Sequence, residues 1–171
     1  RCNGDRQNLD NELEKISIYC EGKKTINAEE ILKLTNLAEN FSIYELTDNC
    51  LSKNLDKTIK ILNENNYSTD DCMLIIRTLL SKAKRVLKLK KDFEKNRNLD
   101  ETISLHKPPI FWKDKEIIKK QILNWSLKDA EKLIYRINDI ELLIKENSLN
   151  SIRIMSDFML SMAAEDHIFN N

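Results

Sequence analysis

Apolar residues recur at intervals of three and four along most of the chain, which is the spacing of one face of an α-helix. The clearest stripes fall within residues 9–20, 31–37, 55–62, 75–96, 117–123, 133–144 and 152–162. No run of useful length alternates between apolar and polar positions, as a half-buried strand would. The pattern therefore predicts an all-α fold whose longest helix ends near Asn96.

Four helix starts carry the signature of an N-terminal cap. In each, a Ser or Asn is followed three positions later by an acidic residue, a spacing that satisfies free backbone amides at the first turn. The four pairs are Asn27 with Glu30, Ser42 with Glu45, Ser68 with Asp71, and Ser126 with Asp129. At the second pair, Phe41 and Leu46 also fit a hydrophobic staple. We therefore expect helices to begin just after these four cap residues.

Two interruptions divide the pattern. Residues 36–41 are interpreted as a linker between a small N-terminal helical unit and the larger helical bundle that follows. Residues 106–112 contain Pro108 and Pro109, which forbid a helix at that point. The bundle should therefore carry one non-helical loop near its middle.

Composition supports helices and narrows the chemistry. Gly and Pro number two each, too few for the tight turns of a sandwich or a doubly wound sheet. The four cysteines form no C-x-x-C pair, so buried, reduced thiols of a cytoplasmic protein are favoured over a zinc site. No apolar run approaches the length of a membrane span, and no signal peptide is visible. The chain begins at Arg1 in what reads as the middle of an element, and we interpret it as a fragment of a longer protein.

Nothing in the sequence indicates an enzyme. Two glycines cannot build a phosphate-binding loop, so no nucleotide cofactor is expected. His106 and His167 have no plausible triad around them and are interpreted as surface residues. No catalytic residue, metal ligand or cofactor is therefore predicted.

Charge is unevenly distributed although the formal net charge is zero. Residues 77–120 hold 14 basic and 6 acidic side chains, whereas the segments on either side are net acidic. Five of the basic residues share one face of the longest predicted helix: Arg77, Lys84, Lys88, Lys91 and Lys95. We call these five the basic face. It is interpreted either as a solvated helix surface or as a contact for the DNA phosphate backbone.

The apolar run after the two prolines, Ile110, Phe111 and Trp112, also has two interpretations. The three side chains could fold into the bundle as a plug. Alternatively, they could form an exposed patch that faces a partner protein.

Several segments resemble the C-terminal part of the delta subunit of the bacterial DNA polymerase III clamp loader. The matching segments are residues 4–9, 12–19, 25–31, 41–48, 77–80, 108–113 with Gln121 and Trp125, and 141–145. The run Pro-Pro-Ile-Phe-Trp-Lys is similar to the alphaproteobacterial members. One departure is Asn147, where the family pattern has a Gly.

The resemblance implies a helical lid in residues 1–40 and a collar domain in residues 41–171. It implies a non-catalytic subunit in DNA replication that assembles with the delta prime and gamma/tau subunits, and the collar could contact primer–template DNA. The sliding clamp would be contacted only through an N-terminal domain absent from this sequence. The alternatives are the collar of a gamma/tau-like ATPase, or a general helical adaptor.

Overall fold

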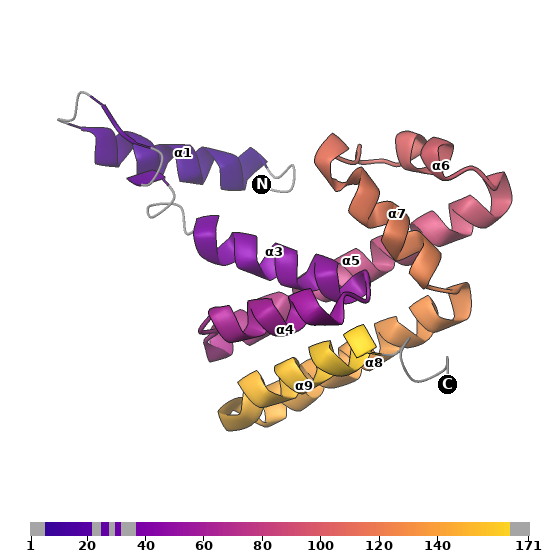
Figure 1. The fold of residues 1–171 in the computed structure, drawn as a ribbon. Coiled ribbons are helices and arrows are strands. Elements are labelled where there is room, and N and C mark those ends of the chain that lie inside the picture. The colour runs from indigo at the N-terminus through magenta and orange to yellow at the C-terminus, as the bar shows by residue number, and fades with distance from the viewer. Residues whose placement is uncertain (1–5, 22–24, 28–29, 32–36, 165–171) are drawn as a thin grey trace. The chain divides into compact units, whose positions relative to one another are not determined.

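A computed structural model describes residues 6–21, 25–27, 30–31 and 37–164, and its elements are helices (Figure 1). They are α1 (Arg6–Cys20), α3 (Leu37–Leu51), α4 (Leu55–Glu64), α5 (Thr69–Asn96), α6 (Leu99–Leu105), α7 (Lys115–Asn124), α8 (Leu127–Glu146) and α9 (Ser151–Ala164). Short 3-10 turns, η1 (Trp112–Asp114) and η2 (Ser148–Asn150), precede α7 and α9. The described part of the chain contains no strand, so the all-α prediction is confirmed.

Internal contacts divide the chain into two compact units, Arg1–Ser42 and Ile43–Asn171. In the first unit, Asn27 Oδ1 accepts a hydrogen bond from the Glu30 backbone amide at 2.8 Å. The Asn27 amide donates in return to Glu30 Oε2 at 3.1 Å, which completes the predicted capping box. The Tyr19 hydroxyl donates to Glu30 Oε1 at 3.1 Å and so connects α1 to this turn.

The second unit is built around α5, the longest helix (Figure 1). α8 lies antiparallel along α5, and α9 packs against α4, α5 and α8. α6 and α7 pack on the C-terminal half of α5, around a small core of Leu89, Ile103, Ile118 and Ile122. A larger core fills the space among α3, α4, α5, α8 and α9. The non-helical loop that precedes α7 therefore rests on the smaller core.

Two of the four predicted caps lie in this unit as expected. Ser68 accepts from the Asp71 amide at 3.2 Å, and Ser126 accepts from the Asp129 amide at 3.1 Å. α5 ends at Asn96, as predicted, and α4 ends just before Asn65. The α5 terminus is closed by Arg97, which adopts a left-handed conformation (φ 52°) and donates its amide to the Phe93 carbonyl at 2.7 Å.

The prediction for Ser42 is wrong. α3 begins at Leu37, so Ser42 lies inside the helix and the proposed linker is helical from residue 37 onward. Residues 37–41 contain neither Gly nor Pro and include Leu, Ala and Glu, which favour helix and outweigh the capping preference of a Ser. Asn36 lies outside the described residues, as does the side chain of Phe41 and with it the proposed staple.

The apolar pattern also missed α6. This short helix begins after Asn98, whose Oδ1 accepts from the Glu101 amide at 3.2 Å. Asn147, at the departure from the family pattern, has a φ of −126° and needs no Gly. None of the described helices has the length and apolar character needed to cross a membrane.

Candidate nucleic-acid and partner interface

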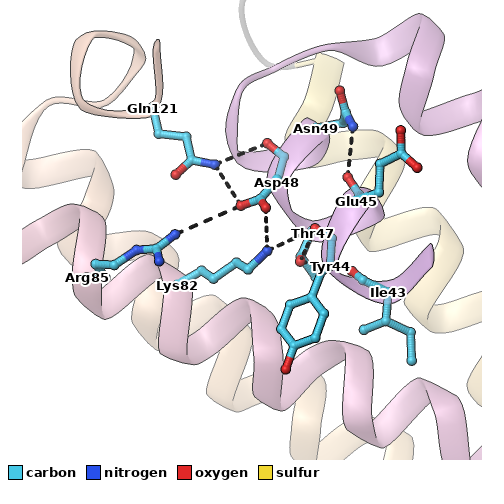
Figure 2. A network of polar contacts seen from close by, with 9 residues as sticks. All are labelled: Ile43, Tyr44, Glu45, Thr47, Asp48, Asn49, Lys82, Arg85 and Gln121. Atoms are coloured by element: carbon cyan, nitrogen blue, oxygen red, sulfur yellow. Dashed lines mark hydrogen bonds and ion pairs between the residues drawn. The ribbon is translucent and has the colours of Figure 1, made fainter. Parts of the chain in front are cut away.

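The carboxylate of Asp48, near the end of α3, joins three helices (Figure 2). Lys82 on α5 places Nζ 2.7 Å from Asp48 Oδ2. Gln121 on α7 donates through Nε2 to Asp48 Oδ1 at 3.1 Å and to its backbone carbonyl at 3.2 Å. Arg85, one turn along α5, lies 4.0 Å from Oδ1. These contacts fix α7 against α3 and α5.

Lys82 is the one buried lysine of residues 77–120, the basic segment of the sequence, and all of that segment lies within the described residues. It has 7% of its surface exposed. Its Nζ also donates to the Tyr44 carbonyl at 2.9 Å and lies 5.0 Å from the centroid of the Tyr44 ring. Burial lowers the pKa of Lys82, and Asp48 opposes that shift. Lys82 is therefore a structural cation and no part of the basic face.

Trp125, which follows α7, makes a second connection to α3. Its buried indole Nε1 donates to the Leu51 carbonyl at 2.8 Å, and Lys53 lies 4.8 Å above the ring. Asn124 Nδ2 donates to the Ser52 carbonyl at 2.8 Å. The C-terminal half of α7 is thus hydrogen-bonded to the end of α3 through Gln121, Asn124 and Trp125. The loop before α7 therefore leads into a helix that is held in place.

The structure divides the basic face into paired and unpaired cations. Arg77 lies 3.6 Å from Glu141, and Lys91 lies 3.1 Å from Glu131, both on α8. Glu141 is also bound by Lys145 at 2.8 Å, and that hydrogen bond is the main reason its pKa is lowered. The remaining three residues, Lys84, Lys88 and Lys95, are exposed and make no ion pair with the described residues.

The three apolar residues after the prolines differ in how deeply they are buried. Ile110 is half-buried against the small core, as a plug would be. Phe111 and Trp112 are 57% and 67% exposed, so the plug interpretation is wrong for them. Their rings contact each other, with centroids 5.8 Å apart and planes inclined at 46°. We call Phe111 and Trp112 the aromatic pair.

His106, at the start of the same loop, is buried, which corrects its interpretation as a surface residue. Its Nδ1 has no hydrogen-bond partner among the described residues. Burial lowers the pKa of His106, and the nearby cations of Lys88 and Arg85 lower it further, against a smaller opposing effect of Asp92. The loop therefore starts beside the basic face.

We expect His106 to make the protein less stable in mild acid. Because its pKa is lower in the folded state, the unfolded chain binds more protons below pH 6.5, and stability falls as the pH drops through that range. His106→Asn should remove this part of the loss. Urea midpoints at pH 7.5 and 5.0 measure it, with His167→Gln as the control. If the urea midpoint falls equally in wild type and His106→Asn, His106 is not the cause of the acid sensitivity.

Metal ligands, reactive thiols and grooves are three further features that could give the described part of the chain a function. No group of three His, Cys, Asp or Glu side chains there could hold a metal ion. Cys50 and Cys72 are buried, as predicted, Cys20 is half-buried, and Cys2 lies outside the described residues. A shallow groove between α8 and α9 is lined mainly by apolar side chains, together with Arg136, Asp157 and Ser161.

Comparison with known proteins gives one informative similarity. The chain is 24% identical over 163 residues to a protein of Aquifex aeolicus (strain VF5) described as "Probable DNA polymerase III subunit delta". The aligned part covers 93% of this chain and 45% of that protein. No family model and no solved structure matches. The chain is thus similar over almost its whole length to somewhat less than half of that protein.

Proposed function

We propose that this chain is the C-terminal part of a clamp-loader delta subunit and that it acts in DNA replication without a catalytic site of its own. The observation that carries this proposal is the similarity to the Aquifex protein over 93% of the chain. The motifs that resemble the delta family, in the same order and spacing, support the same assignment.

In this proposal residues 1–40 belong to the helical lid and residues 41–171 form the collar. The collar packs beside the delta prime and gamma/tau subunits in a ring, and the loader meets the sliding clamp through another domain. A ring subunit needs apolar surface for its neighbours. Large exposed side chains meet that need, including Tyr135 at 72%, Leu142 at 58% and Trp112 at 67% exposure.

Competition tests the assembly role. An excess of this chain should block the entry of the full-length delta subunit of the same organism into a complex with delta prime and gamma/tau. Failure of a folded chain to compete would favour a general adaptor. Binding of ATP by the full-length protein would favour a gamma/tau-like ATPase.

The second part of the proposal is that the basic face contacts the phosphate backbone of primer–template DNA. Backbone contact requires cations that are free to pair with phosphate, and no base-specific group. Lys84, Lys88 and Lys95 meet that requirement, since they are exposed and unpaired within the described residues. Arg77 and Lys91 contribute less, because each already lies beside a carboxylate of α8.

Reversal of Lys84, Lys88 and Lys95 to Glu should weaken DNA binding and reduce the slope of log affinity against log salt concentration by about 3. Fluorescence anisotropy with a labelled primer–template at several salt concentrations measures this slope. Lys57, Lys128 and Lys132 are exposed on other helices and, like the three test residues, make no ion pair with the described residues, so their reversal to Glu is the matched control. Equal binding by both triple variants, with intact helical circular dichroism, would rule out the DNA role of the basic face.

A further inference from the structure

We propose that the aromatic pair is a docking anchor that inserts into an apolar pocket with carboxylates at its rim, on a protein partner. This inference deepens the proposed function, because it places the pocket on another subunit of the loader. It concerns the α6–α7 loop, and it depends on neither the basic face nor DNA.

The aromatic pair is exposed, but its base is fixed. Ile110 packs into the small core directly before it. The Asp114 amide donates to the Phe111 carbonyl at 2.9 Å, which closes the turn that carries Trp112. α7, which follows at once, is fixed to α3 through Gln121 and Trp125. An aromatic anchor held in place before binding loses little conformational freedom in the complex, which favours affinity.

The charges around the pair determine what kind of pocket would fit. Residues 106–120 contain five lysines against Asp114 and Glu116. Lys119 is shared between Asp100 at 2.9 Å and Glu116 at 3.1 Å, so its charge is already engaged within the chain. The exposed lysines of the segment that remain without an ion pair among the described residues are Lys107, Lys113 and Lys120. A complementary partner surface therefore presents carboxylates around an apolar centre.

Single-stranded nucleic acid is the competing occupant, since bases stack on exposed aromatic rings near cations. Stacking requires an open ring face. The Trp112 ring has Phe111 inclined against it, and Lys113 Nζ lies 5.4 Å from its centroid. Phe111 and Lys113 thus occupy part of the space around the Trp112 ring, which favours insertion of the pair into a pocket over a stack of bases. Trp is also among the residues most enriched at the energetic centres of protein interfaces.

The two tryptophans of the chain allow a direct test by fluorine NMR. Trp112 is 67% exposed and Trp125 is 2% exposed, so 5-fluorotryptophan labelling gives one exposed and one buried probe. Addition of unlabelled delta prime and gamma/tau should shift the Trp112 signal and remove its solvent isotope effect. The Trp125 signal should keep its chemical shift. Trp112→Phe assigns the two signals.

A double variant, Phe111→Ala with Trp112→Ala, should weaken the complex at least about 30-fold, the loss typical of a hot spot. Lys113→Glu should weaken it less and should reduce its salt dependence. Leu149→Ala with Ile152→Ala is the matched control, since it also removes two large exposed side chains, from η2 and α9. The aromatic variant should lose more affinity than this control.

The outcomes separate the anchor from the proposed function. A complex that forms while the Trp112 signal stays unchanged, or that tolerates the aromatic variant as well as the control, would overturn the anchor and leave the proposed function standing. A Trp112 shift caused by single-stranded DNA, and not by the proteins, would also overturn it. Absence of any complex with the wild-type chain would contradict both.

Discussion

Replacement of Asp48 by alanine should lower the free energy of unfolding by about 3–5 kcal/mol, the loss typical when a buried charge is left without its partner. The change leaves the Lys82 ammonium without its counter-charge 2.7 Å away, in a site where 7% of the residue is exposed. It also removes the carboxylate that accepts from Gln121. Urea denaturation at pH 7, followed by circular dichroism, measures the loss.

The companion variants show whether the stranded charge is the cause. Lys82→Met alone should cost less than Asp48→Ala, because an apolar side chain of similar length fills the site. Asp48→Ala combined with Lys82→Met should recover much of the stability lost in Asp48→Ala. A double variant as unstable as the sum of the two single ones would contradict the charge argument.

The pH dependence of Asp48→Ala gives an independent check. Burial already lowers the pKa of Lys82, and Asp48 is the main influence that raises it, so the variant should lower it further. At pH values between the lowered pKa of Lys82 and its ordinary pKa of 10.5, the unfolded chain then holds the Lys82 proton more often than the folded chain does. Stability therefore rises with pH in this range. Asp48→Ala should therefore regain stability between pH 7 and pH 10 more than wild type does.

Replacement of Trp125 by alanine should lower the free energy of unfolding by about 3–5 kcal/mol, as for other large buried aromatic residues. Its side chain is 2% exposed and belongs to the larger core. Trp125→Phe should cost about 1–3 kcal/mol, mainly because the Leu51 carbonyl loses the indole donor at 2.8 Å. Chemical denaturation followed by circular dichroism measures both losses.

Trp112→Ala is the control for this series. Because 67% of Trp112 is exposed, its loss should change stability by no more than about 0.5 kcal/mol. A loss as large as that of Trp125→Ala would mean that the aromatic pair is part of the folded core. The inference that it serves as a docking anchor would then fail.

The helix caps were predictable because their chemistry is local. Asn27, Ser68 and Ser126 each bind an amide three residues away, so the sequence alone contains both partners. Ser42 has the same local signature and is not a cap, since the residues before it continue the helix. Local capping signals are therefore reliable only where the preceding residues do not themselves favour a helix.

The burial of Lys82 could have been predicted from its position in the apolar pattern, although its charge suggested an exposed residue. Residues 75, 79, 82, 86 and 89 recur at alternate spacings of four and three, and all five are buried. Lys82 therefore occupies an apolar position of the long helix. Its partner could not be read in the same way, because Asp48 is 34 positions earlier and only tertiary packing brings the two together.

The exposure of the aromatic pair was also beyond the sequence. Ile110, Phe111 and Trp112 are all large and apolar, and each could have filled a gap in the bundle. The small core is already occupied by side chains of α5, α6 and α7, and it accommodates Ile110 at its edge. Which of three apolar neighbours is buried depends on the space that distant helices leave, and no local pattern records that space.

The most direct test of the central claim is the mass of the species formed when this chain is mixed with the delta prime and gamma/tau subunits of the same organism. Size-exclusion chromatography with light scattering measures it. The proposal predicts one peak whose mass equals that of a complex containing all three proteins. Separate elution of each folded component at its own mass would contradict the assignment of this chain as a clamp-loader collar.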